Sequence, residues 1–248
     1  MSLWEYALLF GGVMAGGLAG FAFPVRTRQT LQTVLSFSGA YIVGIIFLHI
    51  APMVFSEGTS HIVGLWVLGG FIGQLFLEQL SAGIEHGHIH APRQLSTGFV
   101  LSVLAGLSIH AYVEGMPLQY YDDLLMHGHD TTAGASGHTH YFAGILLHHM
   151  PAAFALVSLL RLAGLRKWSV LICLAVFASM SPLGAISAGW ISLSVSLQKG
   201  ILGLAMGSLL HIATVILFEM DSSSHMHLSA RRMLAILAGI GASMLTMF

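Results

Sequence analysis

The chain has 248 residues, of which 56% are hydrophobic and only 8% are charged. Soluble globular domains carry about 25% charged residues, so this composition excludes an ordinary soluble domain and predicts an integral membrane protein. Nine basic residues balance ten acidic ones, which leaves no basic surface for nucleic acid. A single cysteine excludes an internal disulfide and a cysteine zinc finger. The unusual feature of this composition is its 15 histidines.

Eight apolar runs separated by polar residues predict eight membrane-spanning helices, because a span needs roughly 20 mostly apolar residues. The runs are 4–23, 34–55, 62–80, 95–118, 141–160, 168–188, 201–218 and 233–248. No positive charge precedes the first run and no small-residue cleavage pattern follows it, so we expect a span there and not a signal peptide. We therefore predict an all-α fold with one transmembrane domain over residues 1–248 and the lipid bilayer as its partner.

The basic residues predict the orientation of these spans. Eight of the nine fall in the connections between runs one and two, three and four, five and six, and seven and eight: Arg26, Arg28, Arg93, Arg161, Arg166, Lys167, Arg231 and Arg232. Lys199 alone falls on the other side. Because cytoplasmic connections retain Lys and Arg, we expect both termini on the outer side of a cytoplasmic (inner or plasma) membrane.

An internal similarity suggests how the spans are arranged. The tetrapeptide Leu-His-Ile-Ala occurs at 48–51 and again at 210–213, and each histidine precedes a glutamate by eight residues (Glu57 and Glu219). Spans two and seven run in opposite directions, so the repeat would be inverted, with spans one to three related to spans six to eight. The expected arrangement is therefore inverted 3+2+3, with spans four and five at the centre. Chance similarity between two apolar helices is the alternative.

Glycines at a spacing of four residues predict close packing of helices. They occur at Gly12, Gly16 and Gly20, at Gly69 and Gly73, and at Gly203 and Gly207. Small residues at this spacing allow the backbones of neighbouring spans to approach each other. We interpret these glycines as packing positions.

Ionisable residues inside spans four and five predict a metal site. Such residues are costly in a bilayer, by about 2.5 to 3.5 kcal/mol for Asp, Lys or Arg at the centre, and usually mark function. His110 and Glu114 lie one helical turn apart in span four, and His148 and His149 precede Pro151 in span five. Imidazole with one carboxylate suits zinc, iron, cobalt or nickel better than magnesium or calcium. The alternative for a single buried histidine is a hydrogen-bonded core residue.

The remaining histidines are candidates for accessory roles. His49 and His211 in spans two and seven are either accessory metal ligands or hydrogen-bonded core residues, and Glu78 and Glu219 near the cytoplasmic ends are expected to be solvated. Short histidine-rich tracts suggest weak, exchangeable capture of metal, with a merely polar linker as the alternative. The loop histidines are His86, His88 and His90 in the cytoplasmic loop 82–94 and His127, His129, His138 and His140 in the outer loop 119–140.

The chain resembles the ZIP family of divalent-metal permeases. Residues 110–115 read His-Ala-Tyr-Val-Glu-Gly, similar to the family pattern His-Asn-x-x-Glu-Gly in span four, and residues 148–153 read His-His-Met-Pro-Ala-Ala, similar to His-Glu-x-Pro-His-Glu in span five. Residues 47–52 and 181–184 also look like family segments. The resemblance implies eight spans with both termini outside, metal ligands on spans four and five, and transport of a divalent metal as substrate. We expect zinc foremost, with iron, manganese and cobalt left open.

The chain departs from the family pattern at the ligands of the second metal. In family members with two metals, the second uses the asparagine of span four and carboxylates of span five. Ala111 and Ala152 cannot ligate, and His149 replaces an acid. What carries over is His110, Glu114 and His148, with His149 as a changed ligand, so we expect one metal site and not two.

The sequence leaves two other functions open beside transport into the cytoplasm. A membrane cytochrome could hold haem between pairs among His49, His110, His148 and His211. An intramembrane zinc hydrolase could use Glu114 as general base, although the sequence lacks a His-Glu-x-x-His motif. No phosphate-binding loop is present, so we expect no nucleotide cofactor. We expect a transporter and not an enzyme, and a homodimer stays open.

Overall fold

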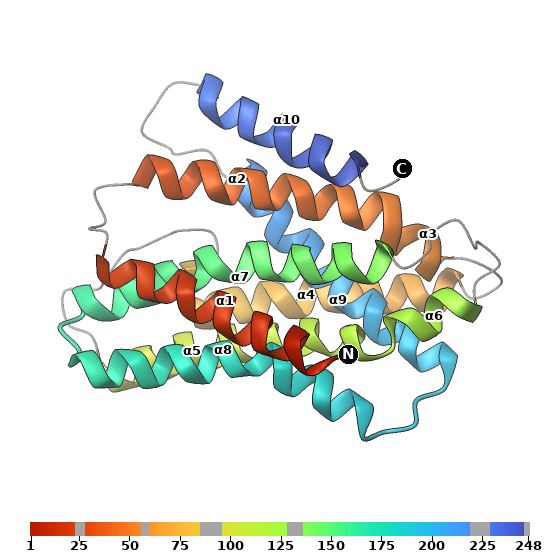
Figure 1. The fold of residues 1–248 in the computed structure, drawn as a ribbon, viewed down its shortest axis with the longest axis horizontal. Coiled ribbons are helices and arrows are strands. Elements are labelled where there is room, and N and C mark those ends of the chain that lie inside the picture. Colours follow the sequence, from red (N-terminus) through yellow and green to blue (C-terminus); the bar gives the residue numbers. More distant parts are fainter. Residues whose placement is uncertain (23–27, 56–59, 85–95, 128–135, 219–228, 246–248) are drawn as a thin grey trace.

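The computed structural model describes residues 1–22, 28–55, 60–84, 96–127, 136–218 and 229–245. These residues form a bundle of helices, most of them long. No strand occurs in these residues. The long helices are α1 (Leu3–Ala22), α2 (Arg28–Ile45), α4 (Ser60–Ser81), α5 (Thr97–Gly115), α7 (Ser136–Leu162), α8 (Lys167–Gly189), α9 (Val195–Phe218) and α10 (Ala230–Met244). Two short helices, α3 (Ala51–Val54) and α6 (Tyr121–His127), extend the bundle at one end (Figure 1).

Seven segments of the described chain have the length and hydropathy of membrane spans. They are Leu3–Ala22, Leu31–Val54, His61–Ser81, Thr97–Gln119, Gly137–Leu162, Lys167–Gly189 and Val195–Phe218. Each coincides with one of the first seven predicted runs. The eighth run coincides with α10, but that helix has 15 residues, or about 22 Å, against a hydrocarbon core of about 30 Å. The helical membrane fold is supported, and the eighth span stays a prediction.

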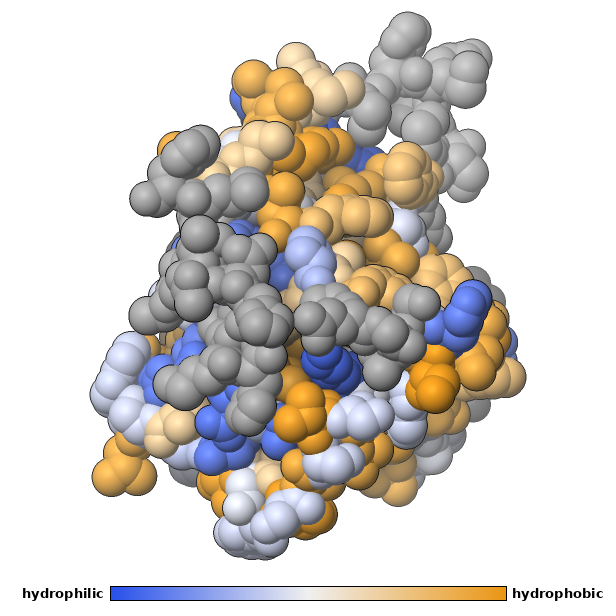
Figure 2. Space-filling model, turned by 90° about the vertical axis from the view of Figure 1, so that its right-hand side faces the viewer, coloured by the Kyte–Doolittle hydropathy of each residue, from blue (hydrophilic) through white to orange (hydrophobic). Residues whose placement is uncertain are grey.

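Both ends of the chain lie toward the same end of the helix bundle. Figure 1 shows N and C in its right-hand half, where α2 ends and α7 begins; we call this the termini end. Figure 2 looks onto this end and shows hydrophilic side chains gathered over its lower part and hydrophobic ones over its upper part. Termini at one end are what an even number of spans predicts.

At the opposite end of the bundle, two arginines donate hydrogen bonds to carbonyl groups at the ends of α1 and α9. Arg161 donates from Nη1 to the carbonyl oxygens of Gly20 and Phe21, where α1 ends. Arg232 donates to the carbonyl oxygen of Ile216 in the last turn of α9. The last carbonyls of a helix lack partners within it, so these arginines satisfy groups that would otherwise be unpaired. Their place away from the termini is consistent with the predicted orientation.

The packing of the helices is compatible with the predicted internal repeat, which stays a prediction. The main packed pairs are α4 with α9, α2 with α10, α1 with α7, and α5 with α8. The predicted repeat exchanges α1 with α8, α2 with α9, α4 with α10, and α5 with α7. Under this exchange the pair α4 and α9 becomes α10 and α2, and the pair α1 and α7 becomes α8 and α5. An inverted 3+2+3 repeat predicts this pattern.

Apolar side chains cover the outside of the bundle, whereas the predicted ligands in α5 and α7 lie inside. Leu65, Phe76 and Ile172 are each more than 60% exposed, while His110 and Glu114 are at most 1% exposed. Exposed apolar surface of this extent is unfavourable in water and expected in lipid. The distribution supports an integral membrane protein.

The predicted packing glycines are confirmed in part. An added Cβ at Gly16 would collide with the main chain of Met150, and one at Gly207 with the main chain of Val67. The prediction is wrong for Gly69 and Gly73, where an added Cβ would meet nothing within 4 Å. Their neighbour Gly70 is the glycine of α4 that lies against the main chain, at Leu204. Gly70 lies about 100° round the helix from Gly69 and therefore faces the partner helix.

Candidate metal site

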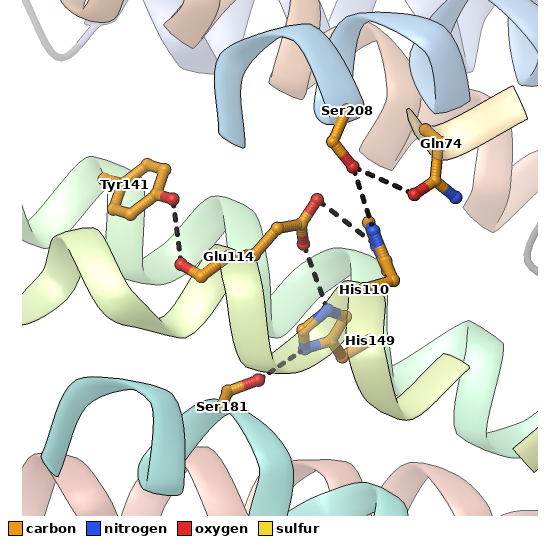
Figure 3. A network of polar contacts seen from close by, with 7 residues as sticks. All are labelled: Gln74, His110, Glu114, Tyr141, His149, Ser181 and Ser208. Carbon is orange, nitrogen blue, oxygen red and sulfur yellow. Dashed lines mark hydrogen bonds and ion pairs between the residues drawn. The ribbon is translucent and has the colours of Figure 1, made fainter. Parts of the chain in front are cut away.

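Three of the four predicted ligands come together in the interior of the bundle. His110 and Glu114 of α5 and His149 of α7 each offer one ligand atom within 4.8 Å of the others. The two oxygens of Glu114 lie 3.2 Å from His110 Nε2 and 3.2 Å from His149 Nε2 (Figure 3). All three side chains are buried. Because His110 and Glu114 are separated by one turn, α5 presents both on the same face.

His148, the fourth predicted ligand, lies beside this group and is not part of it. Its ring centroid is 5.7 Å from that of His110 and 5.6 Å from that of His149. The residue is fully buried, and neither of its ring nitrogens has a hydrogen-bond partner. Burying such groups without a partner is unfavourable. These nitrogens therefore indicate that His148 has a role other than packing.

Proline and glycine shape the helices around the site. Pro151 lies inside α7 two residues after His149, and Pro182 lies inside α8. Proline lacks the N–H that an interior helical residue donates, so each bends or weakens its helix locally. Gly115 of α5 lies against the main chain of Ser181 of α8. This close approach brings α8 near enough for Ser181 to contact His149.

A chain of hydrogen bonds fixes the ring of His110. Its Nδ1 lies 3.1 Å from Ser208 Oγ of α9, and the Ser208 hydroxyl donates to Gln74 Oε1 of α4 at 3.0 Å. The opposite nitrogen of the ring then faces Glu114 (Figure 3). In metal sites, such contacts set the tautomer and orientation of a ligating imidazole.

Comparable contacts hold the other two residues of the group. Ser181 Oγ lies 3.2 Å from His149 Nδ1, so His149 also presents Nε2 to Glu114. The hydroxyl of Tyr141 donates to the carbonyl oxygen of Glu114 at 2.9 Å. Ser181, Tyr141, Ser208 and Gln74 were not among the site residues predicted from the sequence. Their shared signal in the sequence is that they are polar side chains inside apolar runs, and Ser181 also begins the segment 181–184 that resembles the family.

We expect Ser181→Ala and Ser208→Ala each to weaken zinc binding about tenfold, since removal of such supporting groups typically lowers metal affinity 10- to 100-fold. The measurement is equilibrium zinc binding to purified protein in detergent. Ser179→Ala is the matched control, because this half-buried serine of α8 bonds within its own helix, to the carbonyl oxygen of Val176. Equal affinity in all three variants would contradict a supporting role.

The two predicted accessory histidines lie outside the group of three. His211 Nε2 is 2.7 Å from Glu78 Oε2, and its ring packs edge-on against Phe71. The expectation that Glu78 is solvated is wrong: its side chain is 25% exposed and bound to His211, because α4 and α9 pack together. His49 lies near His140, with ring centroids 5.3 Å apart.

Two of the predicted loop histidines belong to a helix. His138 and His140 lie in the first turns of α7, so the outer connection is shorter than predicted. His138 is buried near the rings of Tyr121 and Phe142, and its Nδ1 is 3.6 Å from Glu5 Oε1. The predicted residues His86, His88, His90 and His129 lie outside the described residues, as does the side chain of His127, the last residue of α6.

The apolar bundle contains a buried group of His110, Glu114 and His149 that could hold a metal ion, and it has the character of a helical membrane protein. Residues 85–247, more than half of the chain, match the family described as ZIP zinc transporter. The chain therefore belongs to the ZIP family. This match confirms the resemblance that the motifs indicated. Because the members of the family are transporters, the hydrolase alternative is excluded.

Individual relatives agree with this assignment. The chain is 27% identical over 230 residues to zinc transporter ZIP9 of Micropogonias undulatus, covering 89% of this chain and 68% of that protein. It is 29% identical over 175 residues to zinc transporter ZIP9-B of Xenopus laevis, covering 66% and 55%. It is 32% identical over 118 residues to zinc transporter SLC39A7 of Rattus norvegicus, covering 37% and 25%. The matched part thus spans from a quarter to about two thirds of these relatives.

Proposed function

We propose that the chain transports a divalent transition-metal ion, zinc foremost, into the cytoplasm through a site formed by His110, Glu114, His148 and His149. The observation that carries this proposal is the group of three ligand atoms within 4.8 Å of one another inside an apolar bundle. A fourth, unpartnered imidazole lies beside it. Membership of the ZIP family supports metal transport and disfavours the haem-binding alternative.

The charges of the proposed site favour exchange over permanent retention. One carboxylate and neutral imidazoles leave a bound divalent ion with about one net positive charge, which is unfavourable inside a membrane. Ala111, which follows His110, and Ala152, three residues after His149, are buried and offer no donor atom. We therefore infer that this buried site holds one metal ion and not two.

The proposal includes the predicted topology. Eight spans in an inverted 3+2+3 arrangement, with both termini outside a cytoplasmic membrane, would place this site between the two repeats. Transporters built this way expose a central site to each side in turn. The cytoplasmic loop with His86, His88 and His90 would receive the ion, and a homodimer stays open.

Uptake of radioactive zinc into proteoliposomes tests the proposed function. We expect uptake above that of protein-free vesicles, competition by iron, manganese or cobalt in an order that gives the selectivity, and no uptake by a His110→Ala variant. His61→Ala is the matched control, since this histidine is exposed at the start of α4 and should leave uptake unchanged. Stoichiometric zinc binding without uptake by the wild-type protein would contradict transport.

A further inference from the structure

Helix α2 ends at Ile45 and continues directly into a turn of different geometry. Residues Ile46–Ile50 form a π-helical turn, and the N–H of Ala51 bonds to the carbonyl oxygen of Ile46, five residues back. Pro52 follows and has no N–H to continue the regular pattern. A π-helical turn accommodates an extra residue and is frequent at functional sites. Here the turn contains His49.

The histidine in this turn lies against a histidine of another helix. His49 belongs to the π-helical turn that follows α2, and His140 to the first turns of α7. Their ring centroids are 5.3 Å apart, and the ring planes are inclined by 35°. Both residues are half-buried, and their segments lie at the termini end, where α2 ends and α7 begins. His49 also forms a hydrogen bond with the main chain of Ser243 in α10, which orients its ring.

We propose that His49 and His140 form a second, exchangeable binding site for a divalent transition-metal ion at the termini end of the bundle. Imidazole nitrogens suit zinc, cobalt, nickel and copper, whereas magnesium and calcium require mainly oxygen ligands. Two neutral imidazoles leave the ion its full charge and most of its water ligands. The site therefore binds weakly and releases its ion readily. This proposal concerns binding and does not depend on transport by the chain.

The histidine pair is separate from the buried group. His148 follows His140 by eight positions in α7, which corresponds to about 12 Å along the helix. A small apolar cavity between α2, α7 and α9 occupies this interval, lined among others by Ile50, Tyr141 and Leu209. No single ion can contact both sites across this distance, so each can be removed without the other.

Protection from chemical modification tests the pair residue by residue. Full-length protein in detergent is treated with diethylpyrocarbonate, and modification of His49 is followed by mass spectrometry at increasing zinc concentration. Zinc at ten times its Kd leaves about one site in eleven free, so we expect about tenfold slower modification of His49. Magnesium should give no protection. His61 serves as the exposed control whose modification the pair does not influence.

Variants of His140 decide whether the two rings act together. We expect His140→Gln to abolish zinc protection of His49, and His140→Cys, which restores a metal-binding side chain, to recover it. A His110→Ala, His149→Ala variant should keep the protection, because it lacks only the buried group. Persistent protection of His49 in His140→Gln, absence of protection in the wild-type protein, or loss of it in the buried-group variant would each overturn the proposal. Failure of zinc uptake would leave it standing.

Discussion

Replacing Glu114 with Gln is expected to lower zinc affinity at the buried site by at least about 100-fold and to abolish uptake. Glu114 is the one carboxylate in the group of three, and both its oxygens face imidazoles at 3.2 Å. Glutamine keeps the size of the side chain but removes the negative charge that offsets the ion. Loss of a mere supporting contact lowers metal affinity 10- to 100-fold, so loss of this ligand should exceed that range.

Glu78→Gln provides the control for a change of charge elsewhere in the membrane. This glutamate of α4 pairs with His211 and lies outside the group of three. We expect its zinc affinity to stay within about threefold of wild type, or about 0.7 kcal/mol. Equilibrium binding with radioactive zinc to both purified variants makes the comparison. Equal affinity of Glu114→Gln and the wild-type protein would refute the assignment of the site.

Replacing Gly115 with Ala is expected to destabilise the protein by about 1 to 3 kcal/mol, the usual effect of adding atoms to a well-packed contact. The new Cβ would lie less than 3 Å from three main-chain atoms of Ser181. On the other side of the same contact, Gly184 lies against the main chain of Tyr112. A main chain cannot rotate out of the way as the end of a flexible side chain could, so α8 must move away from α5. That movement would also separate Ser181 from His149 and weaken zinc binding.

Thermal unfolding of the detergent-solubilised protein measures this effect. A loss of about 1 kcal/mol lowers Tm by about 2 to 4 °C in a chain of this length. Gly69→Ala is the control, because an added Cβ there meets nothing within 4 Å and alanine favours helix over glycine. If Gly115→Ala unfolds at the same temperature as Gly69→Ala, the close contact between α5 and α8 does not contribute as described.

The spans and the principal ligands could be predicted from the sequence because both depend on local signals. A run of about 20 apolar residues is sufficient to indicate a span, and seven of the eight runs coincide with candidate spans. Within such runs, His110, Glu114 and His149 stood out as ionisable groups in apolar surroundings. The spacing of His110 and Glu114 placed them on one face without knowledge of the partner helix.

The supporting residues could not be predicted because their role depends on which helix lies opposite. Ser179 and Ser181 are two residues apart in α8, yet one bonds to its own helix and the other to His149. Hydroxyls in helices commonly bond to a carbonyl of the preceding turn, so the sequence does not distinguish the two. The same applies to Gly69 and Gly70, since only the position of α9 decides which of them packs.

The neighbouring imidazoles of α7 bear on how fast a bound ion could leave. His149 contacts Glu114, whereas His148, the next residue, has two nitrogens without partners and lies 5.7 Å from His110. A metal ion changes its coordination most readily when an incoming donor is already at hand as one bond breaks. His148 would supply such a donor, so the ion could pass from one set of ligands to the next while always keeping at least one ligand. At the proposed site, α7 would thus favour rapid ligand substitution over lasting retention.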